Sequence, residues 1–308
     1  MDAPAISSFK EGDVDWEALH GALAARCMKA RVYCKPLLVG WYNELRRRTA
    51  GGSQLLDAPE DALAFLLYNG PGYIDTVLEY FLETCRDESC HFVDGATDAL
   101  LRNIADEFAA ELRAHTINLD KGPPYFHAQS LGVAAGVGQH LDPSEVQDPG
   151  WHESVSRQLL DVRSIDVWGS DTAVRQKIFG ISMHPEFGGW FAYRGLLVLH
   201  GARAPTLQPR QAVVAVKDEA EKMRVLEEYN LRADDCRWRD LTRIGHPPEK
   251  RYTPDEMYFF TDMNMSRRRH FLEMKADLLK LSPKSSTGVS TSEKWGANPD
   301  LVESLHGK

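Results

Sequence analysis

The sequence has few cysteines, no long hydrophobic run and no excess of positive charge. Its 308 residues include five cysteines, an odd number whose spacing matches no common zinc framework. We therefore expect reduced thiols in a reducing compartment. No stretch reaches the roughly 20 apolar residues that a membrane-spanning helix needs. The first residues carry several acids where a signal peptide has an apolar core, so we expect a cytoplasmic protein.

Several common chemistries also lack their sequence signatures. There is no glycine-rich phosphate or dinucleotide loop, no HExxH zinc motif and no GxSxG nucleophile motif. The histidines are scattered, and none lies at metal-ligand spacing from another ligand type. Acidic residues outnumber basic ones by 45 to 36, which gives a net charge of −9. This balance argues against nucleic acid or an anionic membrane as the main partner.

The composition that remains is that of a folded domain with two polar ends. Hydrophobic residues make up 43% of the chain and charged residues 26%. Residues 1–15 are expected to form a loose leader. Residues 283–308 are rich in Ser, Gly, Lys and Pro, so we expect a disordered tail. No linker interrupts residues 16–282, which are expected to form one domain.

Hydrophobic spacing predicts a mixture of helices and strands. Helices are expected over residues 16–29, 73–85, 96–114, 218–229 and 266–281. Strands are expected over residues 62–68, 177–184 and 190–200, while residues 37–42 fit either a strand or the start of a helix. The last two strands are separated by PEFGG, which predicts an antiparallel hairpin. The fold class is therefore expected to be α+β.

An arginine stands inside the apolar strand 190–200. Alternation along a strand predicts that Arg194 shares one face with Leu196 and Val198, while Tyr193 lies on the other face. Burying such a charge is costly unless it meets an anion. Two interpretations stay open: an edge strand whose arginine pairs with a structural carboxylate, or a site for an anionic ligand.

Three other segments offer candidate binding residues. Arg239 lies in the run RWRD, and arginine forks bind carboxylates in a bidentate manner. Arg267 begins a run of three arginines, which fits either an anion site or a solvated helix face. Residues 126–141 are rich in Gly and Ala, which suits either close approach to a flat cofactor or a tightly packed helix.

Four sequence blocks together resemble the CblC family, the methylmalonic aciduria and homocystinuria type C family. The blocks are PLLVGWYNEL at 36–45, the segment 62–85 that contains FLLYNGPGYID, HAQ with the small residues after it at 127–138, and KIFGISMHPEFGGWFAYRG at 177–195. The resemblance extends over roughly residues 30 to 275. The chain departs from the family pattern at Val133, at residues 139–141, at Ser182 and at Cys236.

The resemblance implies a flavin-reductase/nitroreductase-like α+β fold with an antiparallel sheet and flanking helices. It implies an enzyme that binds cobalamin (vitamin B12) with its lower base detached and removes the upper ligand. Alkyl groups would pass to glutathione, and cyanide would leave reductively with reduced flavin, FMN or FAD. The implied protein partners are a CblD-type adaptor and methionine synthase. Homodimer formation on ligand binding stays open, as do two alternatives: a flavin-dependent reductase and a non-catalytic cobalamin chaperone.

The resemblance also implies roles for individual residues. Arg194, Arg239 and Arg267 match the glutathione-binding arginines of the family. The residues that match its cobalamin-binding positions are Phe126, His127, Ala128, Gln129, His140, Leu141, Asp142, Gly180, Ser182 and Tyr193. No catalytic residue is implied, and no metal ligand is needed, because the corrin already holds the cobalt.

Overall fold

A fully buried strand, β3 (Ala62–Asn69), lies inside the main sheet of the computed structural model. The structure describes residues 8–29, 31–50, 54–76, 93–118, 126–162, 177–241 and 247–261, together with 271, 274, 275 and 277. Alternate residues of β3 contact different apolar clusters: Leu63, Phe65 and Leu67 pack into one, and Ala64, Leu66 and Tyr68 into the other. This alternation is the period of two that a strand imposes, so the sheet is covered on both faces.

The five-stranded sheet is mixed rather than wholly antiparallel. Strands β2 (Val32–Leu38), β4 (Ala114–Asn118) and β7 (Ala192–Arg203) complete its antiparallel part, in which β2 pairs with β3 and β7 pairs with both β3 and β4. The short strand β1 (Gly12–Asp13) pairs with β7 in the parallel direction. Phe9 is also buried in the core, so part of the expected leader belongs to the folded domain.

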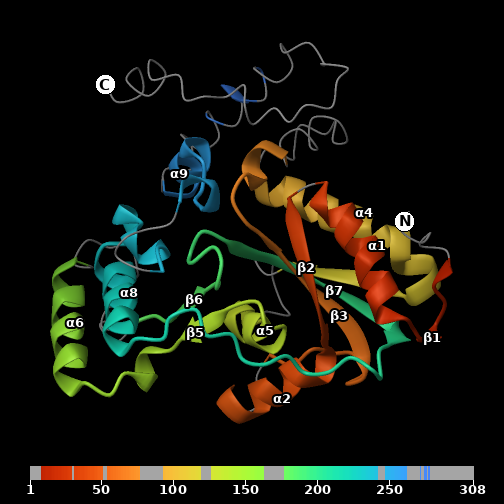
Figure 1. Ribbon diagram of the computed structural model, residues 1–308, viewed down its shortest axis with the longest axis horizontal. Helices are drawn as coiled ribbons and strands as arrows, with labels where there is room; N and C mark the ends of the chain where they lie inside the picture. The colour runs from red at the N-terminus through yellow and green to blue at the C-terminus, as the bar shows by residue number, and fades with distance from the viewer. Residues whose placement is uncertain are drawn as a thin grey trace.

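Helices cover the two faces of the large sheet (Figure 1). On one face lie α1 (Trp16–Met28) and α4 (Val93–Leu112), and on the other lie α2 (Val39–Ala50) and the short α5 (Ala128–Ala134). Asp15 caps α1, since its carboxylate accepts the backbone N–H groups of Glu17 and Ala18. Residues 37–42, which fitted either a strand or the start of a helix, contain both: β2 ends at Leu38 and α2 begins at Val39.

A second layer lies beside the large sheet. Strands β5 (Gln139–Leu141) and β6 (Ile181–Met183) pair with each other, and helices α6 (Pro149–Val162) and α8 (Glu219–Leu231) pack around a third apolar cluster there (Figure 1). Asp218 caps α8 through the N–H of Glu221. Short 3-10 helices complete this part of the chain at Pro143–Glu145 (η2), Ala233–Asp235 (η3), Arg237–Arg239 (η4) and Pro248–Lys250 (η5).

The predicted hairpin between residues 177–184 and 190–200 is wrong in its pairing. A tight turn does exist, because His184 and Gly188 exchange backbone hydrogen bonds of 2.7 and 2.9 Å. The strands on either side of it join different sheets, however: β6 pairs with β5, and β7 pairs with β3 and β4. The turn therefore connects the two layers instead of closing one ribbon.

A shift in strand register changes the direction of Arg194. Leu67 faces Gly195 and Tyr68 faces Tyr193, so Arg194 is the additional residue of a bulge. Beyond the bulge the faces exchange, and Tyr193 packs in the same cluster as Leu196 and Val198. The expected shared face of Arg194 and Leu196 is therefore wrong. Because β7 has neighbours on both sides, the edge-strand interpretation of Arg194 is wrong as well.

The expected helices 73–85 and 266–281 lie mostly outside the described residues, as does the tail 283–308. Within the helices of the described part of the chain, no segment has the length and apolarity to cross a membrane.

A buried glutamate joins the segment after β3 to helix α9 (Pro254–Thr261). The Glu256 carboxylate is fully buried and accepts the backbone N–H groups of Gly72 (2.8 Å), Tyr73 (2.7 Å), Ile74 (3.3 Å) and Thr253 (2.9 Å). The Thr253 hydroxyl accepts the N–H of Glu256 in return, which completes a capping box. One carboxylate thus satisfies donors from two distant segments.

Replacing this glutamate is expected to destabilise the whole domain. In Glu256→Ala, four backbone N–H groups lose their acceptor, and each buried unsatisfied group costs about 1–3 kcal/mol. We expect a loss of at least about 4 kcal/mol, equivalent to a Tm lower by about 8 °C or more. Thermal unfolding measured beside the exposed control Glu249→Ala checks this; equal Tm values for the two variants would contradict it.

Candidate functional site

The segment expected to bind cobalamin begins at the cap of α5. The His127 Nδ1 accepts the backbone N–H of Ser130 at 3.2 Å and lies 2.8 Å from its hydroxyl. The backbone N–H of His127 donates to the Tyr42 hydroxyl at 3.2 Å. Burial, assisted by the nearby Arg46 charge, lowers the pKa of His127 to about 4, so its imidazole is neutral near pH 7. Phe126 is buried before the cap, and Ala128 and Gln129 are half-buried in the first turn.

The second expected group lies on β5 and β6. His140 stands directly opposite Ser182 in the ladder, and its ring lies edge-on to that of His127 with centroids 5.9 Å apart. A side chain at Gly180 would lie 2.6 Å from Cε1 of His140 and 2.8 Å from the Leu141 carbonyl oxygen. Gly180 therefore permits close packing of its own segment on β5.

Two of the expected residues have structural contacts of their own. The side chain of Leu141 is fully buried in the apolar cluster between α6 and α8. Asp142 caps the 3-10 helix η2, where its carboxylate accepts the backbone N–H and the hydroxyl of Ser144 at 2.9 and 2.8 Å. The residues that the structure brings together are thus His127, His140, Gly180, Ser182 and Tyr193.

Three polar atoms are buried where β5, β6 and β7 meet α5. They are Nδ1 of His140, Oγ of Ser182 and the hydroxyl of Tyr193, and within the described residues none of them has a hydrogen-bond partner outside this cluster. Burial raises the pKa of Tyr193, and the nearby Ser182 hydroxyl opposes that rise. Because an unsatisfied buried polar group costs about 1–3 kcal/mol, this cluster has the character of a binding site for a polar ligand.

The Tyr193 ring is fixed by two glycines. A Cβ at Gly132 would lie 1.8 Å from the Tyr193 hydroxyl oxygen and 2.4 Å from Cζ, and a Cβ at Gly138 would lie 2.9 Å from the same oxygen. The small residues of 126–141 therefore serve close packing at these two positions. Sequence reasoning found the stretch but did not single out either glycine, because the tyrosine that requires them is more than 50 residues away.

The bulge on β7 directs Arg194 into an aromatic cage. Its Nε donates to Oδ1 of Asn69 at 2.6 Å, and its guanidinium lies 5.0 Å from the centre of the Tyr73 ring and 5.4 Å from that of Phe260. The side chain is buried. The Asn69 amide and the faces of the two rings thus contact the guanidinium, and an aromatic face attracts a cation without carrying a formal charge of its own.

Arg239 lies in a second aromatic cage formed by Trp238, Tyr252 and Trp190. The ring centres are 4.2, 5.2 and 5.5 Å from its guanidinium. One terminal nitrogen donates to the Gly189 carbonyl at 2.5 Å, and the Gly189 N–H donates to the Arg239 carbonyl at 2.7 Å. The Nε of Arg239 is buried and finds no acceptor among the described residues. A Cβ at Gly189 would lie 2.6 Å from the Trp238 ring.

The two arginines act on the same tyrosine. Burial raises the pKa of Tyr252, while the charges of Arg239 and then Arg194 oppose that rise. Two of the three expected glutathione-binding arginines thus act electrostatically on the same phenol, although they are 45 positions apart in the chain. Arg267 lies outside the described residues.

Other residues around the arginines were missed by sequence reasoning. The Asp240 carboxylate accepts Nε1 of Trp190 at 2.9 Å and a terminal nitrogen of Arg251 at 2.8 Å. Asp240 ends the run RWRD and Arg251 follows about ten residues later in the chain, but only the fold places both beside Trp190. Among the described residues, no group of three or more His, Cys, Asp or Glu side chains could hold a metal ion.

Known proteins resemble this chain over most of its length. The chain is 30% identical over 231 residues to the mouse protein named cyanocobalamin reductase / alkylcobalamin dealkylase, covering 73% of this chain and 72% of that protein. It is 27% identical over 258 residues to the chicken protein of the same name, covering 82% and 94%. The crystal structure of the Caenorhabditis elegans B12-trafficking protein CblC aligns with a TM-score of 0.63 at 19% identity, over 83% of this chain and 97% of that one, and so shares the fold.

The family model of methylmalonic aciduria and homocystinuria type C matches residues 31–272. This range contains all four sequence blocks and every residue expected to bind cobalamin or glutathione. The chain therefore belongs to the methylmalonic aciduria and homocystinuria type C family, whose members process cobalamin.

Proposed function

We propose that this chain binds cobalamin in its base-off form and removes the upper ligand, by glutathione-dependent dealkylation of alkylcobalamins and by reductive decyanation of cyanocobalamin. The observation that carries this proposal is the cluster of buried polar atoms on His140, Ser182 and Tyr193. All three stand at positions that match the cobalamin-binding positions of the family. The amide side chains around a corrin ring both donate and accept hydrogen bonds, so they can satisfy such atoms.

The arginines support the transfer of alkyl groups to glutathione. Glutathione carries two carboxylates, and Arg194 and Arg239 present guanidinium groups in two aromatic cages, with the charges of both acting on Tyr252. Binding both carboxylates would hold the sulfur in line with the cobalt-bound carbon. The thiolate then forms the new S–C bond as the Co–C bond breaks, and that bond's electron pair stays on cobalt.

The reductive reaction needs electrons from outside the polypeptide. Reduced flavin, FMN or FAD, is the proposed donor, and cyanide leaves as the cobalt is reduced. The relationship to flavin reductases and nitroreductases is part of the same proposal. The proposed recipients of the processed cobalamin are a CblD-type adaptor and methionine synthase in the cytoplasm, and homodimer formation on ligand binding belongs to the same set of proposals.

The visible spectrum of methylcobalamin tests the proposal directly. Mixing with the protein is expected to shift the absorption to shorter wavelength, as base-off binding requires. Anaerobic glutathione should then produce the bands of reduced cobalamin. A shift without turnover would favour a non-catalytic chaperone. No shift, from protein that carries flavin, would favour a flavin-dependent reductase.

A further inference from the structure

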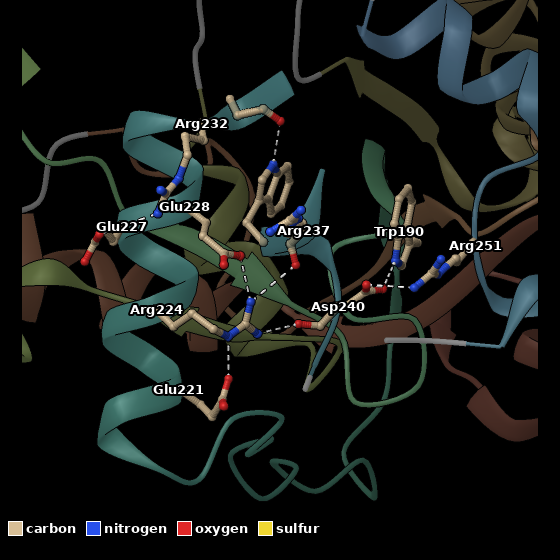
Figure 2. A network of polar contacts seen from close by, with 11 residues as sticks. Trp190, Glu221, Arg224, Glu227, Glu228, Arg232, Arg237, Asp240 and Arg251 are labelled. Atoms are coloured by element: carbon tan, nitrogen blue, oxygen red, sulfur yellow. Dashed lines mark hydrogen bonds and ion pairs between the residues drawn. The ribbon is translucent and has the colours of Figure 1, made fainter. Parts of the chain in front are cut away.

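Arg239 is located on the η4 turn, whose backbone is held by hydrogen bonds from a side chain outside the proposed glutathione site. Arg224 of α8 has a side chain only 9% exposed, and its guanidinium binds Glu221 and Glu228 of the same helix at 2.5 and 2.7 Å. Its terminal nitrogens donate to the Asp240 carbonyl at 2.9 Å and to the Arg237 carbonyl at 3.4 Å (Figure 2). One carbonyl lies two residues before Arg239 and the other belongs to the residue directly after it. Arg224 therefore fixes the backbone on both sides of it.

The side chain of Asp240 fixes one wall of the cage. Its two carboxylate oxygens accept separately, one from Nε1 of Trp190 and the other from Arg251, as Figure 2 shows. The Trp190 ring lies against the Arg239 guanidinium, with 5.5 Å between the ring centre and the guanidinium carbon. Without the acceptor on Asp240, a buried indole N–H would lose its partner and the ring would lose its orientation.

We propose that Asp240 and Arg224 are positioning residues for Arg239: Asp240 acts through the Trp190 ring, and Arg224 acts through the backbone of the η4 turn. This inference rests on the proposed role of Arg239 in binding glutathione. Neither residue needs to touch the substrate. Each reduces the number of directions that the Arg239 guanidinium can adopt, and an anion site gains affinity from such preorganisation.

Steady-state dealkylation of methylcobalamin at varied glutathione concentration tests the inference. Asp240→Ala is expected to raise the KM for glutathione about tenfold, while kcat and the Kd for cobalamin change about twofold or less. Arg224→Lys should raise the KM severalfold, because an ammonium lacks the planar fork that holds both carbonyls. Asp240→Asn retains an acceptor for Trp190 and is expected to restore most of the affinity.

The matched control is Asp61→Ala. Asp61 also binds an arginine, Arg203, at 2.7 Å, but both side chains are more than half exposed and their pair contains neither Trp190 nor the η4 turn. This variant should leave the KM for glutathione unchanged. If Asp240→Ala also loses cobalamin binding, the KM for glutathione of Arg224→Lys is compared with that of Asp240→Asn instead. The inference requires the higher KM in Arg224→Lys.

A double variant separates positioning from a general loss of structure. If Asp240 acts through Arg239, then adding Asp240→Ala to Arg239→Gln should raise the KM no further. Additive increases would overturn the inference. If Arg239→Gln alone leaves the KM for glutathione unchanged, the proposed role of Arg239 fails. If Arg239→Gln raises the KM while Asp240→Ala and Arg224→Lys do not, only the positioning role fails.

Discussion

Arg194→Gln is expected to abolish most glutathione-dependent dealkylation while leaving cobalamin binding intact. Arg194 supplies a buried positive charge, and truncating a charged partner in a desolvated site costs about 2–5 kcal/mol, so the rate at low glutathione should fall about 100-fold. Glutamine is long enough to keep contact with Asn69, whose amide binds the Arg194 Nε at 2.6 Å. The Kd for cobalamin should therefore change by less than about threefold.

The identity of the thiol distinguishes charge recognition from a general defect. A thiol without carboxylates, such as 2-mercaptoethanol, gains little from Arg194, so its slower reaction should be nearly the same in the wild type and in Arg194→Gln. The matched control is Arg203→Gln on the same strand, because Arg203 is about half exposed and paired with Asp61 at the far end of β7. Equal losses with both thiols would contradict a role for Arg194 in binding carboxylates.

Gly132→Ala is expected to have the largest effect on cobalamin binding. The added methyl group would lie 1.8 Å from the Tyr193 hydroxyl oxygen, well inside van der Waals contact, so either α5 or the tyrosine must move. Overpacking of this kind costs about 1–3 kcal/mol, and the movement also displaces the polar cluster around Ser182. We expect the Kd for methylcobalamin to rise by about 10-fold or more, measured by the spectral shift on titration.

The control for this prediction is another helical glycine, Gly21 of α1, beside which a Cβ would meet no atom within 4 Å. Gly21→Ala should keep the affinity for cobalamin and gain up to about 1 kcal/mol of stability, because alanine is the better helix former. Combining Gly132→Ala with Tyr193→Ala relieves the clash, so it should recover thermal stability without recovering affinity. Full affinity in Gly132→Ala itself would show that Tyr193 does not shape the site.

Local sequence determined the element types and the family. The caps at Asp15 and Asp218 and the apolar run at 62–68 act within a few residues, so helices α1 and α8 and strand β3 follow from them directly. The block at 177–195 placed Ser182, Tyr193 and Arg194 together because they lie close in the chain. The family match over residues 31–272 confirms the recognition that this block supported.

Tertiary structure decided which way these residues point. The hairpin was predicted from a turn signal, but strand pairing depends on partners far along the chain. In the structure β6 pairs with β5, and β7 pairs with β3. A single additional residue in β7, at the bulge opposite Tyr68, exchanged the faces of Tyr193 and Arg194. An alternation pattern in one strand does not predict such a bulge, because the bulge depends on the register of two strands.

The supporting contacts of the site were also set by the fold alone. Asp240 meets Trp190 across 50 positions, Gly132 meets Tyr193 across 61, and Arg194 meets Asn69 across 125. Sequence identifies a residue whose chemistry is unusual at its own position, such as an arginine in an apolar strand. It does not identify the partners that fix the residue's direction, because those contacts form only when distant segments pack together.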